Sequence, residues 1–475
     1  MPKVLLTLFV LLASIGFQAV AQTPGRQWTL AECIDQALSK NLTVQQRRLT
    51  AASGTIDVKA AKLAMLPSIN GTASENFNFG RNVDPVSNTY ININTASTTF
   101  GINSSVTLFS GFQLQNQLKQ SKVNAKVFDY DLASAQNDIA LSVASFFLQV
   151  LYAEDNVTNA KAQADATKLQ KERTEKLVNI GRLSQNNLFD IEAQLANEEL
   201  NVVNAENALF SARLSLCQLL EIGYDPNFSV KRPVIALPQV PAQADVQSIF
   251  NQAAGTRPEI LGAEARLESS KIGLQISKGA VYPRLVVGAG VNTLFTDKFQ
   301  RFAGLTLNGI TPIGITKTTL DTVFAPSYSS RFEKVPFGEQ LSTNFGQFAG
   351  FQLSIPIFNG YRIGASINKA KIATESARLN LDLAKNNLMK NIQQAVADLN
   401  AARLRYEASE KSFQAQKLSF ENTETRYNQG LSNFFDYSTS KNNKNRAETS
   451  LLQAKYELVF RAKVLDFYLG KPLEL

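Results

Sequence analysis

Two stretches of the chain combine a helical pattern with a lack of helix breakers. No glycine or proline occurs from position 112 to 180, and Gly111 and Gly181 flank this segment. Gly360 and Gly430 flank a second segment with the same spacing of 70 residues, interrupted only by Gly364. In the first segment an apolar residue recurs every seven positions, which is typical of helices packed side by side. These positions are Leu118, Ala125, Leu132, Ile139, Phe146, Ala153 and Ala160.

Each long segment predicts a helix of about 100 Å at 1.5 Å per residue. The positions equivalent to the first heptad series are mostly small or apolar: Ile367, Thr374, Leu381, Leu388, Ala395, Ala402 and Ser409. Another breaker-free stretch follows each terminal glycine, over 182–222 and 431–469. Since glycine readily ends a helix, we expect a short turn there and an antiparallel partner helix. The pattern therefore predicts helical hairpins over 111–222 and 360–469.

The segments before these hairpins alternate with period two, as strands do. Ile69, Gly71 and Ala73 begin one such run, and Leu285 and Val287 begin another. Each run returns after a polar connection, which predicts β-hairpins over 67–109 and 283–358. Strands of about ten residues with one long polar loop are typical of membrane barrels, although the edge of a soluble sandwich shows the same alternation.

Four strands cannot close a barrel, and lipid tolerates no open sheet edge. Either the sheet is soluble or several chains share one barrel. Two chains would supply eight strands, and three would supply twelve.

An internal duplication organises these elements. Residues 64–69 reappear as 280–285 at an offset of 216, and residues 108–112 match 357–361 at an offset of 249. The change of 33 residues predicts an insertion in the outer loop of the second β-hairpin. We interpret 22–240 and 241–475 as two repeats. The repeats differ in two ways: this insertion, and three extra residues expected at the first helical turn. We expect these differences to determine gating and the choice of partner.

The first 21 residues resemble a secretory signal peptide. Lys3 precedes an apolar run over 4–17, and Ala19 and Ala21 form a small-x-small cleavage site. No later run of 18 apolar residues follows, so a membrane location would depend on strands. The formal net charge is +8, but the cations are scattered singly. Together with export, this argues against a nucleic-acid partner.

The composition argues against catalysis. The chain has no histidine, the commonest general base and metal ligand. No Walker-type phosphate loop is present, and Gly288 and Gly290 fit close packing within a strand better than a ligand loop. We therefore expect no enzyme activity, cofactor or metal. Cys33 and Cys217 are compatible with a disulfide or with two buried thiols.

Several motifs together resemble the TolC-like outer-membrane efflux proteins over essentially the whole mature chain. Residues 28–41 resemble the first-helix pattern of that family, and residues 257–260, Arg-Pro-Glu-Ile, resemble its counterpart in the second repeat. Residues 108–111 and 357–360 resemble the strand-to-helix junctions. Residues 427–430, Tyr-Asn-Gln-Gly, resemble the turn at the periplasmic tip.

The resemblance implies a mainly α protein with membrane β structure. Three chains would form an α-helical barrel and share a twelve-stranded β-barrel in outer-membrane lipid, with four strands from each chain. A periplasmic adaptor (membrane fusion protein) and an inner-membrane transporter would be its partners in efflux or type I secretion. The channel would conduct passively, and the transporter would select the cargo.

The resemblance also suggests functional residues at the helical tips. Asp436 would be a carboxylate facing the pore, with Asp190 a weaker candidate; a first-turn acid stabilised by the helix dipole is the alternative. Thr439 stands where a second carboxylate would strengthen the ring, and Ser432 stands where an arginine can lock the tip. Three cations follow on the same helix: Lys441, Lys444 and Arg446. The sequence therefore decides neither whether the channel prefers cations nor whether this lock exists. The expected adaptor contacts are Gly181, Arg182, Leu183, Ser184, Tyr427, Gly430, Leu431 and Ser432.

Two other classes of protein share parts of this pattern. A periplasmic adaptor also pairs a signal peptide with a helical hairpin, but normally has one hairpin rather than two. A structural coiled-coil protein of an export complex would leave the alternating strands unexplained.

Overall fold

The computed structural model describes residues 27–83, 88–233 and 245–473. The predicted signal peptide and the boundary between the two repeats at 240/241 lie outside these residues. The chain divides into two compact units, a helical one built from residues 1–55, 123–268 and 375–475, and one containing the sheet, built from 56–122 and 269–374. The helices α3, α4, α7 and α9 each contribute residues to both units.

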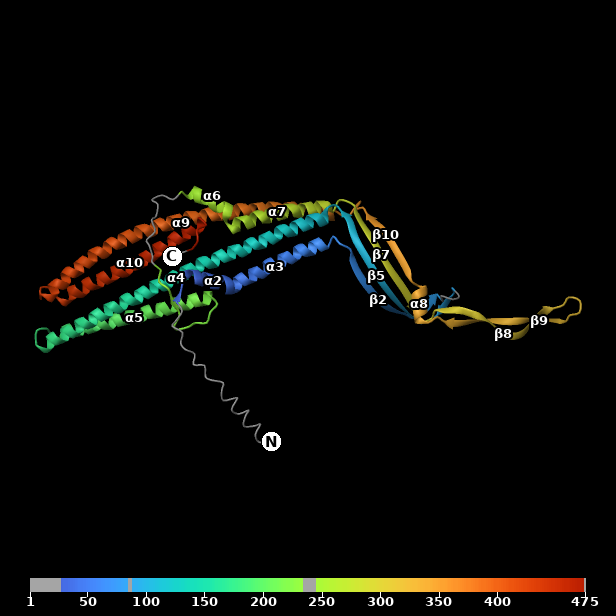
Figure 1. Ribbon diagram of the computed structural model, residues 1–475, viewed down its shortest axis with the longest axis horizontal. Helices are drawn as coiled ribbons and strands as arrows, with labels where there is room; N and C mark the ends of the chain where they lie inside the picture. Colours follow the sequence, from blue (N-terminus) through green and yellow to red (C-terminus); the bar gives the residue numbers. More distant parts are fainter. Residues whose placement is uncertain (1–26, 84–87, 234–244, 474–475) are drawn as a thin grey trace, which may run out of the picture. The chain divides into compact units, whose positions relative to one another are not determined.

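The helices repeat with matching lengths, as the duplication predicts (Figure 1). The short pairs have 11 and 22 residues in both repeats, the long helices 67 and their partners 35. The first repeat contains α2 Leu30–Lys40, α3 Leu42–Leu63, α4 Gln113–Asn179 and α5 Gln185–Leu219. The second contains α6 Val246–Thr256, α7 Pro258–Gly279, α9 Arg362–Asn428 and α10 Phe434–Tyr468. Both predicted offsets, 216 and 249, are therefore confirmed by the starts of the helices.

Local caps explain where the short helices begin and end. Thr29 and Glu32 form a capping box at the start of α2, which satisfies backbone donors that have no partner inside the helix. Asn41 caps the start of α3 and donates to the carbonyl of Leu219 near the end of α5, at 3.4 Å. At the equivalent position in the second repeat, Arg257 donates to the carbonyl of Phe467 near the end of α10. The two repeats thus tie corresponding helix ends together through different side chains.

The helical unit contains two apolar cores. One joins α2, α4, α5 and α10 with a small parallel sheet of β1 Gln27–Trp28 and β6 Ser229–Val230. Cys33 and Cys217 are both buried thiols in this core. The second core joins α6, α7, α9 and α10, and contains three of the predicted heptad positions on α9, namely Leu381, Leu388 and Ala402. Ala395, a fourth heptad position, is also buried. The equivalent positions on α4 are mostly half-buried in the single chain.

The second unit contains a four-stranded antiparallel sheet in the order β10-β7-β5-β2. Its strands are β2 Ser68–Asn78, β5 Thr95–Ser110, β7 Arg284–Thr296 and β10 Gly346–Ser354, and they correspond to the two predicted β-hairpins. At Gly290 a Cβ would lie 2.8 Å from the Ile102 carbonyl oxygen and 2.8 Å from the Phe348 ring. Close packing therefore explains this glycine, as the sequence suggested. The outer strands β2 and β10 each have a neighbour on one side only in this sheet.

Further strands occupy the connections. The first outer loop contains β3 Arg81–Val83 and β4 Tyr90–Asn92, which pair with each other. The expected loop insertion of the second repeat is instead an ordered two-stranded sheet of β8 Gln300–Ile315 and β9 Thr322–Lys334, followed by α8 Phe337–Thr343. Within the described residues, no helix is both long and apolar enough to cross a membrane.

Candidate functional site at the tips of the helical hairpins

The two turns that connect the long helices to their partners have the same length. Residues 180–184 connect α4 to α5, and residues 429–433 connect α9 to α10. The expectation of three extra residues in the first turn is therefore wrong. It arose from aligning Asp190 with Asp436, whereas the residue equivalent to Asp436 is Asn187, and Asp190 lies about one turn further along α5.

Gly181 and Gly430 end their helices in the left-handed conformation, with φ of 72° and 76°. The next amide donates back to the helix in both turns, from Arg182 to the Leu177 carbonyl and from Leu431 to the Arg426 carbonyl. This is the Schellman pattern, which favours glycine. A Cβ at either glycine would meet no atom within 4 Å, so the conformation rather than space requires glycine.

The predicted contact residues lie in or beside these turns. Gly181, Arg182 and Ser184 are exposed and Leu183 is half-buried, while Leu431 in the second turn is 67% exposed. Ser184 occupies the N-cap position of α5 without a side-chain capping bond. The two tips thus present an apolar side chain and small polar groups around an ordered backbone.

Asp436 lies in the first turn of α10, where its carboxylate accepts from the Ser432 hydroxyl at 3.3 Å. The N-cap residue Asn433 accepts from the backbone amide of Asp436 at 2.8 Å. Asp436 and Thr439 are both exposed on α10, and Asp190 is exposed on α5. The geometry thus accommodates a first-turn acid at the positive end of the helix, and leaves its carboxylate accessible to solvent.

An aromatic cluster holds α9 against α10 just behind the second turn. The rings of Tyr427 and Tyr437 stack with their centroids 4.8 Å apart, and Phe420 and Phe434 pack around Tyr437. Burial raises the pKa of Tyr437 to about 12. Burial also raises the pKa of Tyr427, which hydrogen bonds to Gln170 on α4. The predicted tip tyrosine thus belongs to an interhelical core.

Behind this aromatic cluster lies a buried charged group that sequence reasoning missed. Lys441 on α10 lies 3.4 Å from the Glu198 carboxylate on α5, and each side chain is 6% exposed. Thr167 on α4 contacts both groups through its hydroxyl. Gln194 donates to Glu198 at 3.2 Å and accepts from Ser438 at 2.5 Å. We call Thr167, Gln194, Glu198, Ser438 and Lys441 the buried polar cluster.

In the sequence, Lys441, Lys444 and Arg446 follow Asp436 on one helix, which leaves cation selectivity undecided. The structure buries Lys441, pairs Lys444 with Glu448 at 2.8 Å and leaves Arg446 exposed. Lys441 follows the buried Tyr437 by four residues, which places both on one face of α10. That spacing is the signal that could have identified its burial.

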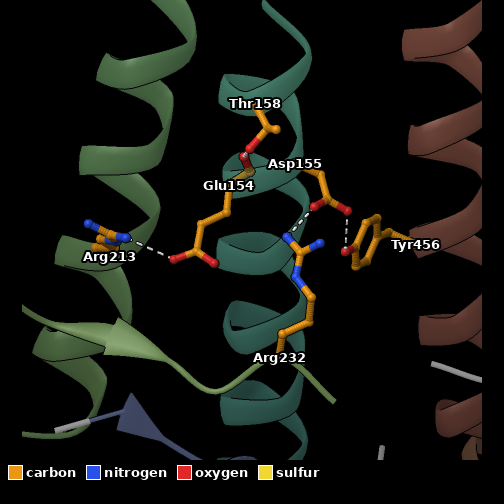
Figure 2. Close-up of polar contacts among 6 residues, drawn as sticks. All are labelled: Glu154, Asp155, Thr158, Arg213, Arg232 and Tyr456. Carbon is orange, nitrogen blue, oxygen red and sulfur yellow. Dashed lines mark hydrogen bonds and ion pairs between the residues drawn. The ribbon is translucent and has the colours of Figure 1, made fainter. Parts of the chain in front are cut away.

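A second polar connection joins α4 to α10 and to the segment after β6. Figure 2 shows the Asp155 carboxylate between Tyr456 of α10 and Arg232, and the Tyr456 hydroxyl donates to it at 2.7 Å. The adjacent Glu154 turns toward α5, where Arg213 donates to it at 2.8 Å. Consecutive carboxylates of α4 therefore hold different helices. With the buried polar cluster, they connect the two helical hairpins at two levels.

The described residues contain no group of three or more histidine, cysteine or acidic side chains that could hold a metal ion. What they provide is two long helical hairpins, ordered tips and a sheet with unpaired edges.

The comparisons identify the family. A family model for outer membrane efflux proteins matches residues 33–221 and 323–471, more than half of the chain. The chain belongs to the outer membrane efflux protein family, whose members are outer-membrane channels and not enzymes. The predicted membership, location and mainly α fold are thereby confirmed.

Individual relatives are distant but cover most of the chain. The chain is 22% identical to the outer membrane protein TolC of Vibrio cholerae serotype O1, over 93% of this chain and 90% of that one. It is 21% identical to toxin and drug export protein A of Aggregatibacter actinomycetemcomitans, over 90% and 83%. Among solved structures, it resembles the outer membrane protein VceC of Vibrio cholerae with a TM-score of 0.73 at 15% identity, over 94% and 97%. That likeness supports the fold.

Proposed function

We propose that this chain is the outer-membrane subunit of a tripartite efflux or type I secretion system. Three copies form the channel, and it conducts passively from a periplasmic pump complex to the exterior. The observation that carries this proposal is that β2 and β10, the outer strands of the sheet, each have one edge without a partner strand in a family member that resides in the outer membrane. Such edges cannot face lipid, and a neighbouring copy supplies the missing partner for each.

Conduction is tested with purified protein in planar bilayers. We expect discrete current steps under an applied voltage without ATP or a partner pump, because the open channel conducts passively. Protein that fractionates with the outer membrane but never conducts as an assembled oligomer would refute the proposal.

We propose Asp436 as the carboxylate that sets ion selectivity at the constriction, with Thr439 and Asp190 as secondary lining residues. Its exposed carboxylate at the end of the hairpin supports this role. Replicated around an axis, such carboxylates attract cations and repel anions. The Asp436→Ala variant should lose cation preference while retaining the parental oligomer. Unchanged selectivity would remove Asp436 from this role.

We place the periplasmic adaptor, which connects the channel to an inner-membrane transporter, at the two turns. Their exposed apolar residues, Ile180 in the first turn and Leu431 in the second, support this location. The Leu431→Glu variant should reduce export at least tenfold. It should not disturb the end of α9, because the backbone conformation of residue 431 does not require glycine. Replacing Gly181 or Gly430 by a bulky residue should abolish export too. Normal export by Leu431→Glu with unchanged adaptor cross-linking would contradict this placement.

A further inference from the structure

The inserted sheet of β8 and β9 has a pairing pattern that sorts its side chains onto two different faces. The register shifts three times along β8, between Phe302 and Gly304, between Leu307 and Gly309, and between Pro312 and Gly314. Each shift inserts one extra residue opposite β9, as a β-bulge does. Gly304 and Gly309 have φ of 130° and 110°, which explains glycine at these two bulges.

The bulges bring apolar residues of β8 into phase although their spacing in the sequence is irregular. Phe302, Leu305, Leu307 and Ile310 pair with residues 332, 330, 328 and 326 of β9, and all four partners lie on one face because strand faces alternate. Phe324 and Tyr328 extend this face. We call Phe302, Leu305, Leu307, Ile310, Phe324 and Tyr328 the apolar ribbon face. Its members are 56–68% exposed in the single chain.

The opposite face has a different composition. Thr306 pairs with Ser329, Gly309 with Ser327 and Thr311 with Ala325. From Phe302 to Ile315 and from Thr322 to Ser330, neither strand contains a charged residue. The charges lie at the base, where Arg301 bonds to Glu333 at 2.7 Å and also contacts Glu339.

This composition favours a second copy of the chain over a lipid surface as the occupant of the apolar ribbon face. Amphipathic elements that lie on membranes carry lysine and arginine on their polar side, and no lysine or arginine occurs at residues 302–315 or 322–330. A charged protein partner would find no complementary group there either. An uncharged apolar face instead matches an identical face on a neighbouring ribbon.

The base of the ribbon is fixed to the channel sheet. Only residues 297–299 separate β7 from β8, and the Gln340 side chain of α8 bonds to both the backbone amide and the carbonyl of Thr296. Thr293 of β7 also donates to the Leu341 carbonyl at 2.8 Å. If copies join through the edges of β2 and β10, each ribbon starts at the same level as its neighbours. The ribbon contact then continues the barrel interface.

We propose that the ribbons of the copies converge with their apolar faces toward the shared axis and narrow the outer mouth of the channel. This inference rests on the proposed function, because it needs copies assembled around one pore. It assigns a subunit interface to the insertion that distinguishes the second repeat from the first. The small, hydroxyl-rich opposite face is left toward water.

Cysteine cross-linking in native outer membranes tests the contact. The Leu307→Cys variant should give a cross-linked dimer with a short flexible bismaleimide, and the Thr306→Cys variant at least tenfold less. These neighbours lie on opposite faces of the ribbon. The parental chain, whose two cysteines are buried, gives the background. Equal yields for the two variants, or none for Leu307→Cys, would overturn the proposal.

Two further measurements separate the possible failures. Native mass spectrometry of each variant and of the parental chain reports assembly. A monomeric parental chain would contradict the proposed function. An intact oligomer that gives no cross-link would contradict only the ribbon contact. A fluorophore on Leu307→Cys in proteoliposomes reports lipid. Strong quenching by spin-labelled acyl chains would assign the apolar ribbon face to the membrane and overturn the proposal; quenching no stronger than at Thr306→Cys supports it.

Discussion

Lys441 and Glu198 form an ion pair inside the helical unit, where Thr167 supplies hydrogen bonds to both. A buried charge without its partner is far more costly than an exposed one, because water no longer solvates it. The pair therefore contributes less to net stability than to the choice of arrangement, since α10 can pack here only in the register that brings Lys441 to Glu198.

Replacing Lys441 by methionine leaves the Glu198 carboxylate buried without its cation. We expect Lys441→Met to lower the free energy of unfolding by about 3 kcal/mol, measured from the helical circular dichroism in urea. The control is Lys444→Met on the same helix, which breaks an i,i+4 pair with Glu448 and should cost about 0.5 kcal/mol or less. Equal losses of unfolding free energy in the two variants would show that burying this ion pair does not make it more important for stability than the half-buried pair of Lys444 and Glu448.

The same lysine predicts a pH dependence. Burial lowers the pKa of Lys441 below its ordinary value of 10.5, against the opposing effect of Glu198. Between the lowered pKa and 10.5 the unfolded chain binds more protons than the folded one, so the free energy of unfolding rises with pH. The stability of the parent relative to Lys441→Met should therefore increase as pH rises toward 10.5 and then level off. A difference that falls over this range would contradict the burial effect.

At the scale of elements, the duplication could be predicted well because glycines lie just outside both ends of the long helices α4 and α9. The lengths of α4 and α9 follow from uninterrupted sequence between Gly111 and Gly181 and between Gly360 and Gly430. The β8–β9 ribbon was missed because its apolar residues do not alternate strictly. Bulges restore their phase, and bulges depend on the pairing of two strands rather than on one strand's pattern.

The strand-to-helix junctions provide a matched comparison between the repeats. Gly111 and Gly360 have φ of 62° and 63°, so alanine at either position adopts an unfavourable left-handed conformation. Only at Gly111 would the new Cβ also lie 2.1 Å from a backbone oxygen, that of Gly279. We expect Gly360→Ala to cost about 1 kcal/mol and Gly111→Ala to cost clearly more in urea denaturation. Similar losses would mean that the close approach at Gly111 is not a constraint.

At the scale of the whole molecule, the surroundings of the site residues depend on contacts between distant helices, and the proposed assembly depends on further copies of the chain. Tyr427 and Gly430 could be identified from the sequence because turn chemistry is local. The burial of Lys441 could not be predicted because it depends on α4 and α5, which meet α10 only in the folded chain. The exposed strand edges β2 and β10 remain incomplete until a partner chain is added, and this makes oligomerisation the central structural claim.

Native mass spectrometry of protein extracted from the outer membrane tests this claim most directly. On the proposed assembly the chain should appear as a trimer, in which three copies of the four-stranded sheet would close a twelve-stranded barrel without an open edge. A protein that is monomeric after extraction in mild detergent, yet fully folded and resident in the outer membrane, would contradict the account.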